Sequence, residues 1–303
     1  MQYFYDKDFK MNNTCVSFGH FDGLHRGHRA VINKLIEQEK KNLTSVLLSF
    51  DYVPTNIFGV EKVIYNEEEK QMILAENAPN VMISYPFTKD TANMDPETFV
   101  KDILVDKLGV KVIVAGENCR FGKGCSGDIK TLESLASKYG YDVVCVDTAY
   151  ENNEEITSKI IYNALCEGLL DKANKLLGHT FTMLGEIAHG KALGRTVGMP
   201  TANLAVSENK LIPKHGVYAT LSEVDGKKVQ GLTNIGKRPS VDDNDYVTIE
   251  TFLLDFSKNI YGKKVVLEVH SYIRGVHKFN NLDEVKKQVE KDITSIRAYL
   301  NSI

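Results

Sequence analysis

The sequence has little of several features that mark specialised classes of protein. It has only five cysteines, at positions 15, 119, 125, 145 and 166, and no two of them form a CxxC pair. Such an odd, unpaired set disfavours a disulfide framework or a zinc site and favours reduced thiols in a cytosol. No apolar run approaches the roughly 18 residues of a membrane span, and residues 1–13 are too polar for a signal peptide. We therefore expect a cytoplasmic protein without a membrane partner.

A charge imbalance is also absent, as are internal repeats and low-complexity tracts. The 37 basic and 40 acidic residues give a net charge of −3, and the basic residues are scattered along the chain. This charge pattern gives no reason to expect a nucleic-acid partner or an anionic membrane surface. A hydrophobic content of 43% is ordinary for a soluble globular protein, and 303 residues suggest about two domains. The sequence does not indicate an oligomeric state.

The first half alternates strand-like and helix-like segments. Strands are expected at 14–18, 45–50, 81–85, 110–115 and 141–146, and helices at about 28–41, 67–75, 96–108 and 128–139. The run 110–115 is continuously apolar, which is typical of a strand buried on both faces. Strands that alternate with helices predict a parallel sheet in a doubly wound α/β domain.

The second half has a different texture. Short strand-like runs occur at 180–187, 216–221, 228–235, 246–255 and 264–273, and turn-forming residues separate them. This pattern predicts a small antiparallel barrel. A helical segment, 158–177, broken at Gly168, joins the halves. The chain ends in a stripe of apolar residues at helical spacing, which predicts a helix packed on the barrel: Leu282, Val285, Val289, Ile293, Ile296 and Leu300.

A glycine-rich segment in the second half has the composition of a phosphate-binding loop. Gly194 and Gly198 precede Pro200, Thr201 and Asn203. Glycine lets the backbone approach a ligand closely, and hydroxyl and amide oxygens suit Mg²⁺ held together with substrate phosphates. The segment indicates a nucleotide-phosphate loop that follows neither the P-loop nor the dinucleotide-binding pattern. The alternative is a surface turn that enters a strand.

A second candidate site lies between the first expected strand and the first expected helix, in the sequence GHFDGLHRGH at 19–28. At this place in an α/β sheet a helix N-terminus meets an anion. His25 and His28, with Gly27 between them, could face one phosphate and stabilise charge on a triphosphate. Zinc binding is disfavoured because no third ligand lies nearby. The alternative is two histidines exposed at the start of a helix.

The HxGH element resembles the signature of the nucleotidyltransferase superfamily, and FDGLHRGH resembles the FMN adenylyltransferase half of bacterial bifunctional riboflavin kinase/FAD synthetases. The sequence GENCRFG at 116–122 is similar to a later loop of that family. The resemblance implies that His25 and His28 are catalytic. It also implies a set of residues that bind ATP or its phosphates: Gly19, Phe21, Asp22, Gly23, Gly27, Asn118 and Ser158.

The sequences GRTVGMPTANL at 194–204 and NIGKRP at 234–239, followed by Glu250, resemble the riboflavin kinase half of the same family. The resemblance implies that Glu250 is the general base for the riboflavin 5′-hydroxyl and that Thr201 and Asn203 ligate Mg²⁺. It places Gly194, Arg195, Gly198 and Pro200 at the ATP phosphates. The implied flavin-binding residues are Asn234, Arg238, Arg274 and Phe279.

These residues of the second half have plain structural alternatives. Strand alternation can place the Glu250 carboxylate in solvent, and Arg238 and Arg274 can be solvated surface charges. Asn234 before Gly236 is equally typical of a turn. The joint occurrence of all these motifs in one order favours the kinase hypothesis.

The resemblance covers nearly the whole chain and follows the family's domain order. It implies an α/β, Rossmann-like nucleotidyltransferase domain at 1–172 and a small antiparallel β-barrel riboflavin kinase domain with a C-terminal helix at 173–303. The implied substrates are ATP, riboflavin and FMN, with Mg²⁺ as cofactor.

The sequence departs from the family's motifs mainly in the first domain. The segment 50–54 lacks the family's histidine, and Ile64 and Tyr65 replace a Leu-Thr pair before the Glu-Lys element. Lys159 and Tyr162 stand where the family has Thr and Arg, and a phenol cannot replace the charged fork of arginine. Three hypotheses follow: an enzyme with both activities, a riboflavin kinase with a degenerate first domain, and a non-catalytic flavin- or nucleotide-binding regulator. The intact PTAN segment and Glu250 disfavour the regulator.

Overall fold

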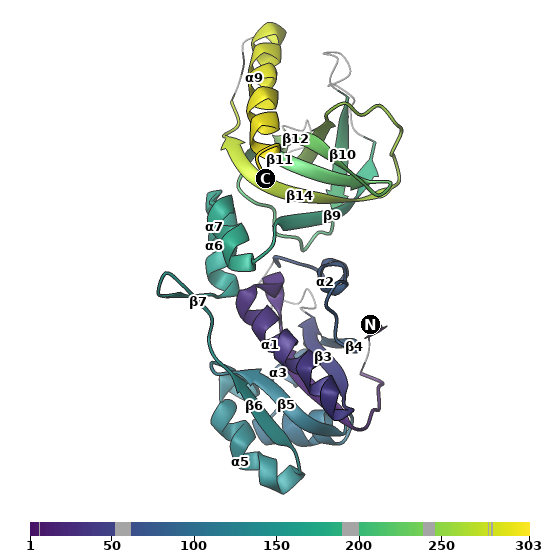
Figure 1. The fold of residues 1–303 in the computed structure, drawn as a ribbon, viewed down its shortest axis with the longest axis vertical. Helices are drawn as coiled ribbons and strands as arrows, with labels where there is room; N and C mark the ends of the chain where they lie inside the picture. The colour runs from purple at the N-terminus through teal and green to yellow at the C-terminus, as the bar shows by residue number, and fades with distance from the viewer. Residues whose placement is uncertain (6, 52–61, 190–199, 239–245, 278, 280) are drawn as a thin grey trace. The chain divides into compact units, whose positions relative to one another are not determined.

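The structure is a computed structural model that describes residues 1–303 except 6, 52–61, 190–199, 239–245, 278 and 280. The chain divides into two compact units, Met1–Ser158 and Lys159–Ile303 (Figure 1). The predicted boundary after residue 172 falls inside α7 (Leu170–Leu177) and stays a prediction. Among the described residues, no helix is long and apolar enough to cross a membrane.

The first unit is built on a parallel sheet with the strand order β1-β4-β3-β2-β5-β6. The strands are β1 (Gln2–Phe4), β2 (Thr14–Gly19), β3 (Thr44–Asp51), β4 (Val81–Pro86), β5 (Val110–Gly116) and β6 (Asp142–Val146). From the central β2 the chain builds β3 and β4 on one side and then crosses to build β5 and β6 on the other. The strand order therefore reverses between β2 and β5, and in open α/β sheets ligands bind in the crevice at this point.

Apolar side chains cover both faces of this sheet because successive strand residues point to opposite sides. Cys15 belongs to the cluster on one face, and Val16, the next residue of β2, belongs to the cluster on the other. Helix α1 (Arg26–Glu37) packs on the Cys15 side through Leu35, and α5 (Ile129–Tyr139) covers the Val16 side. The predicted doubly wound α/β fold is confirmed.

The predicted helices of this unit recur with small shifts, and one of them has an unexpected geometry. The segment predicted as a helix over 96–108 begins as α4 (Pro96–Thr98) and continues as a π-helical stretch, Phe99–Val105. Helix α2 (Glu67–Leu74) begins at an Asn66 capping box. The edge strand β1 and the small hairpin of β7 (Tyr150–Glu151) and β8 (Glu154–Glu155) were not predicted, and each of these strands has only two or three residues.

The second unit begins with α6 (Ser158–Glu167) and α7, which are separated at Gly168, where φ is +78°. A closed antiparallel barrel follows, with the strand order β10-β13-β12-β11-β14-β9. Its strands are β9 (Phe181–Ala188), β10 (Thr201–Val206), β11 (Gly216–Val224), β12 (Lys227–Arg238), β13 (Tyr246–Leu253) and β14 (Lys264–Arg274). The predicted barrel is confirmed. One strand, β10, was not among those predicted: it starts inside the PTAN segment, where we predicted a nucleotide-phosphate loop or, as the alternative, a surface turn that enters a strand.

Helix α9 (Leu282–Leu300) packs on the outside of the barrel, as predicted. Four side chains of its apolar stripe pack against barrel residues such as Val217. They are Val289, Ile293, Ile296 and Leu300. The expected participation of Leu282 in the stripe is wrong, because that side chain lies in the first turn and is 61% exposed. The stripe instead contains a charged residue, Asp292, that is 3% exposed.

Replacement of Gly185 by alanine is expected to open the barrel where β9 meets β10. A Cβ at this position would lie 2.3 Å from the Ala205 carbonyl oxygen, in the backbone of the paired strand. Overpacking of this kind costs about 1–3 kcal/mol of unfolding free energy. Chemical denaturation of the full chain, followed by hydrogen exchange in β9 and β10, measures the change.

The matched control is Gly236→Ala in β12, where the nearest atom to the new Cβ is 3.6 Å away, an ordinary contact. Equal unfolding midpoints for the two variants would contradict the prediction.

Candidate active sites

A pocket of about 300 Å³ opens at the carboxyl ends of β2 and β5, where the strand order reverses. It contains most of the residues predicted for nucleotide binding and catalysis in the first unit. They are Gly19, Phe21, His25, Gly27, His28, Asn118 and Ser158. The predicted residues Asp22 and Gly23 do not line it. Residues from both halves of the unit thus meet at one edge of the sheet.

His25 and His28 form a stacked pair at the start of α1. His25 is the N-cap residue, and its Nδ1 accepts a hydrogen bond from the His28 amide at 3.3 Å. The ring centroids are 3.6 Å apart with an angle of 20° between the planes. Among the described residues, Nδ1 of His28 is a buried atom without a hydrogen-bond partner. The helix start therefore fixes Nδ1 of His25, whereas Nδ1 of His28 is buried without a partner among the described residues.

Burial keeps these rings neutral at physiological pH. It lowers the pKa of His25 to about 4, and it lowers the pKa of His28 well below the usual 6.5. Electrostatic repulsion from His25 in its protonated form, from the Lys70 ammonium and from protonated His20 lowers the pKa of His28 further. Neutral imidazoles can donate N–H hydrogen bonds to phosphate oxygens without adding positive charge to the pocket.

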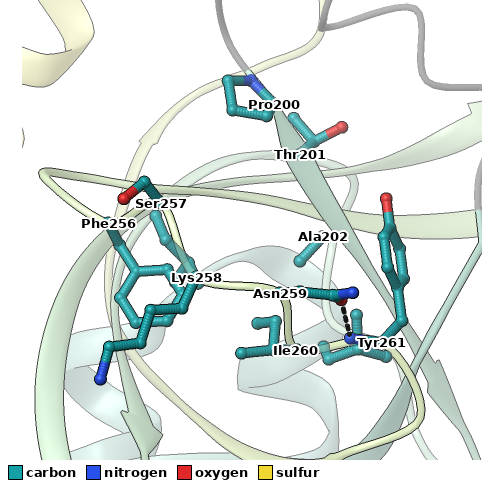
Figure 2. A pocket seen from close by; sticks show the side chains of 11 residues that line it. Pro200, Thr201, Ala202, Phe256, Ser257, Lys258, Asn259, Ile260 and Tyr261 are labelled. Atoms are coloured by element: carbon teal, nitrogen blue, oxygen red, sulfur yellow. Dashed lines mark hydrogen bonds between the residues drawn. The ribbon is translucent and has the colours of Figure 1, made fainter.

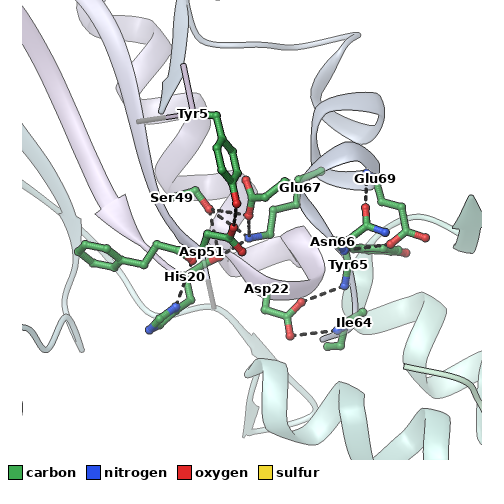
Figure 3. A network of polar contacts seen from close by, with 12 residues as sticks. Tyr5, His20, Asp22, Ser49, Asp51, Ile64, Tyr65, Asn66, Glu67 and Glu69 are labelled. Carbon is green, nitrogen blue, oxygen red and sulfur yellow. Dashed lines mark hydrogen bonds and ion pairs between the residues drawn. The ribbon is translucent and has the colours of Figure 1, made fainter. Parts of the chain in front are cut away.

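Asp22 holds the turn after β2 rather than facing the pocket. Its carboxylate accepts hydrogen bonds from the backbone amides of Ile64 and Tyr65 at 3.1 and 3.0 Å (Figure 3). The Ser158 hydroxyl donates to the Asp22 carbonyl at 2.8 Å. Because the amides at 64 and 65 make the contact, the departure from Leu-Thr at these positions leaves it intact.

Asn118 follows β5 and lies beside the hairpin of β7 and β8. Its side-chain amide donates to the Glu155 carboxylate, and Arg26 of the HRGH element forms an ion pair with Glu151. The hairpin is therefore connected to two segments that border the pocket, the loop after β5 and the first turn of α1. Sequence reasoning missed this hairpin, because two-residue strands carry no periodic signal.

In the second unit, strand register places the predicted kinase residues in one row. Glu250 of β13 lies directly opposite Asn203 of β10 on one side and Asn234 of β12 on the other. The row continues through Val217 of β11 to Arg274 of β14. Directly opposed residues share a face of the sheet. Val217 packs in the cluster under α9, so this face is the outside of the barrel.

Asn203, Asn234 and Glu250 are half-buried, as is Thr201, two residues before Asn203 and on the same face of β10. A pocket of about 260 Å³ adjoins this end of β10 and includes Pro200, Thr201 and the segment 256–261 (Figure 2). The Asn259 side chain accepts a hydrogen bond from the Tyr261 amide at 3.1 Å. The Tyr261 ring stacks on His189 with centroids 3.9 Å apart. Thr201 thus lines a pocket that also contains Tyr261, whereas Asn203 and Glu250 are paired on the neighbouring strands and do not line it.

Arg274, predicted to bind flavin, is tied to α9. Its Nε and Nη2 donate to the buried Asp292 carboxylate, at 2.7 Å for the shortest contact, and its Nη1 donates to the Gly275 carbonyl. The guanidinium carbon is 5.9 Å from the centre of the Phe279 ring, also a predicted flavin residue. Sequence reasoning missed Asp292, because it looks like an ordinary charged residue between apolar helix positions.

Some predicted residues cannot be placed. Gly194, Arg195 and Gly198 lie outside the described residues. Arg238 ends β12 opposite Tyr246, and only its backbone is described. The departure from the family's histidine at 52–54 also lies outside the described residues. The roles inferred for these positions remain predictions from the sequence.

Comparisons with known proteins agree on both halves of the chain. The family model for FAD synthetase matches residues 8–160, and the model for riboflavin kinase matches residues 177–300. A bifunctional riboflavin kinase/FMN adenylyltransferase of Escherichia coli K12 is 35% identical over 293 residues, which cover 94% of this chain and 92% of that protein. A protein of the same description from Listeria monocytogenes EGD-e is 35% identical over 292 residues, with 95% and 92% covered.

A solved structure, described as a macrolide-efflux protein from Streptococcus pneumoniae, matches with a TM-score of 0.88 and 26% identity. The match covers 98% of this chain and 99% of that one.

Acidification is expected to destabilise the first unit through its buried histidines. Burial lowers the pKa of both His20 and His25 to about 4, so below the usual value of 6.5 the unfolded chain binds more protons than the folded unit. The stability that the neutral rings confer is complete above about pH 6.5 and is lost as the pH falls towards about 4. Hydrogen exchange of β2 and α1 in urea at pH 7, 6 and 5 measures this loss.

In the variant His25→Gln, which removes one of the titrating rings, the difference in unfolding midpoint between pH 7 and pH 5 should shrink. A native protein with the same midpoint at both pH values would refute the assignment.

Proposed function

The chain belongs to the bifunctional riboflavin kinase/FMN adenylyltransferase family, and we propose which of its residues carry each of the two reactions. The enzyme phosphorylates riboflavin to FMN with ATP and adenylylates FMN to FAD. The first unit corresponds to the FAD synthetase match and the second to the riboflavin kinase match.

The row Asn203–Glu250–Asn234 is the observation that supports most strongly the proposed kinase site. Glu250 is the general base that accepts the proton of the riboflavin 5′-hydroxyl as the hydroxyl oxygen attacks the γ-phosphorus of ATP and ADP leaves. Backbone pairing places an asparagine on either side of Glu250, and both asparagines offer amide groups to the reactants. Phosphoryl transfer demands mainly positioning and electrostatic stabilisation, and a row of side chains held by backbone pairing provides positioning.

The donor set at the start of β10 fits Mg²⁺. The Thr201 hydroxyl and the Asn203 amide oxygen are hard oxygen ligands of the kind that Mg²⁺ takes together with substrate phosphates. Among the described residues, no cluster of three or more His, Cys, Asp and Glu side chains could hold a metal ion. When bound, Mg²⁺ would neutralise charge on the ATP phosphates. Thr201 and Asn203 would orient it beside Glu250.

In the first unit, the His25–His28 pair supports adenylyl transfer. A phosphate oxygen of FMN attacks the α-phosphorus of ATP, and pyrophosphate leaves. His25 and His28 would donate hydrogen bonds to the phosphates as negative charge builds up on them. The pair lies at the helix N-terminus, where backbone amides add to this stabilisation. Asn118, from the loop after β5, would orient the nucleotide from the other side of the pocket.

The comparisons favour the hypothesis of two activities over a kinase with a degenerate first domain and over a non-catalytic regulator. Relatives named for both reactions align over more than nine-tenths of this chain. The departures at Lys159 and Tyr162 are then tolerated substitutions in a working enzyme.

The variant Glu250→Ala should lose most riboflavin kinase activity. General-base catalysis is typically worth about 10²–10⁴-fold, so FMN formation should slow by a factor in that range. Chromatography of the flavins formed from riboflavin, ATP and Mg²⁺ measures it. FAD formation from added FMN serves as the control, since it uses the other unit. Normal FMN turnover in this variant would remove Glu250 from the mechanism.

The double variant Lys159→Thr/Tyr162→Arg restores the family's residues and should raise FAD formation from FMN. One added charge-assisted hydrogen bond to a phosphate is worth about 1.5–3 kcal/mol, which corresponds to at least about a tenfold gain. Phosphorylation of riboflavin should stay unchanged. If FAD formation does not increase, these two departures do not limit the reaction.

A further inference from the structure

A buried lysine lies behind the phosphate-binding turn of the first unit. The Lys70 side chain, on α2, is 5% exposed and pairs with the Glu67 carboxylate at 2.7 Å. Its ammonium also donates to the His20 carbonyl at 2.8 Å and to the Ser49 hydroxyl at 3.1 Å. An ammonium has three N–H donors, and each has an acceptor here. Figure 3 shows these acceptors, His20, Ser49 and Glu67, gathered at the end of β3.

Stability alone does not account for this ammonium. Removal of two charges from water costs several kcal/mol for each ion, and apolar residues of similar size often replace a buried ion pair without loss of stability. The contact that distinguishes Lys70 from a simple partner of Glu67 is its hydrogen bond to the His20 backbone. The hydrogen bond holds the residue directly before Phe21, where the turn after β2 begins.

The turn needs such support because Phe21 has a left-handed backbone, with φ 50° and ψ 29°. A bulky residue rarely adopts this conformation, and surrounding contacts must hold it. Lys70 fixes the peptide group before Phe21 through the His20 carbonyl. Asp22, the residue after Phe21, is fixed through its carboxylate and its carbonyl. The strained residue is therefore held on both sides.

The direction of the His20 carbonyl determines where the Phe21 amide points. In a planar trans peptide, the C=O and the following N–H point in opposite directions. The carbonyl is directed at Lys70, which does not line the pocket, whereas His20 and Phe21 do. The Phe21 N–H is thus turned away from Lys70. The Phe21 ring lies against His28, with centroids 5.2 Å apart.

We propose that Lys70, held by Glu67, is a positioning residue for adenylyl transfer. It orients the peptide between His20 and Phe21 so that the Phe21 amide and the His28 ring meet the nucleotide phosphates together. Lys70 touches no substrate and acts through the backbone. This inference rests on the adenylyl transfer proposed for the first unit.

The test compares Lys70→Met with the native full chain. We expect kcat for FAD formation from FMN and ATP to fall roughly a hundredfold, since a misplacement of about 1 Å by a remote mutation can cost that much. The KM for FMN should change far less, and riboflavin kinase activity should stay at the native level. Lys138→Met is the matched control, because it removes a lysine paired with Glu97 on the surface of the same unit. Its kcat should equal that of the native protein.

A second variant separates positioning from folding. Glu67→Leu/Lys70→Met replaces the ion pair with apolar side chains and should keep the native unfolding midpoint, with FAD formation as slow as in Lys70→Met. A native kcat in either variant overturns the proposal. Failure of both variants to fold also overturns it, because the pair would then be needed for stability. Absence of FAD formation by the native protein would instead refute the function proposed for the unit.

Discussion

The register between neighbouring strands is the constraint on which the candidate kinase site depends. Asn203, Glu250 and Asn234 are far apart in the sequence and come together only because β10 and β12 pair with β13 in one alignment. A slip of one residue would move a whole strand's side chains to the other face of the sheet. Closure of the barrel between β9 and β10 fixes this alignment, since no strand is left at a free edge.

The two candidate sites differ in the charge and burial of their key side chains. In the first, burial keeps His25 and His28 neutral, so the pocket can receive a highly charged nucleotide with donors that carry no charge of their own. In the second, Glu250 stays half-buried on the outside of a barrel, where a carboxylate remains hydrated and can accept a proton. In the proposed mechanism, the first unit supports transfer with hydrogen-bond donors and the second with a general base.

The sequence predicted both folds, and most of the residues that it proposed for the first unit line the pocket there, because these features depend on local patterns. The apolar run 110–115 predicts a strand buried on both faces, and the HRGH sequence lies between an expected strand and an expected helix. What it missed depends on tertiary contacts. Strand β10 directly follows Pro200 and contains Asn203, both residue types that are typical of turns, and its pairing with β9 and β13 decides its conformation. Asp292 and Lys70 look like surface charges until Arg274 and the His20 carbonyl are placed beside them.

His25 has two duties, since it is both a proposed catalytic group and the N-cap of α1. Loss of an N-cap side chain typically costs about 1 kcal/mol of stability, so selection for a folded protein would retain this histidine even in a lineage with no need to make FAD. His25 is therefore subject to two independent constraints, one from the start of α1 and one from the proposed catalysis. In an evolutionary comparison, His28, which caps nothing, is the better marker of continued selection for catalysis.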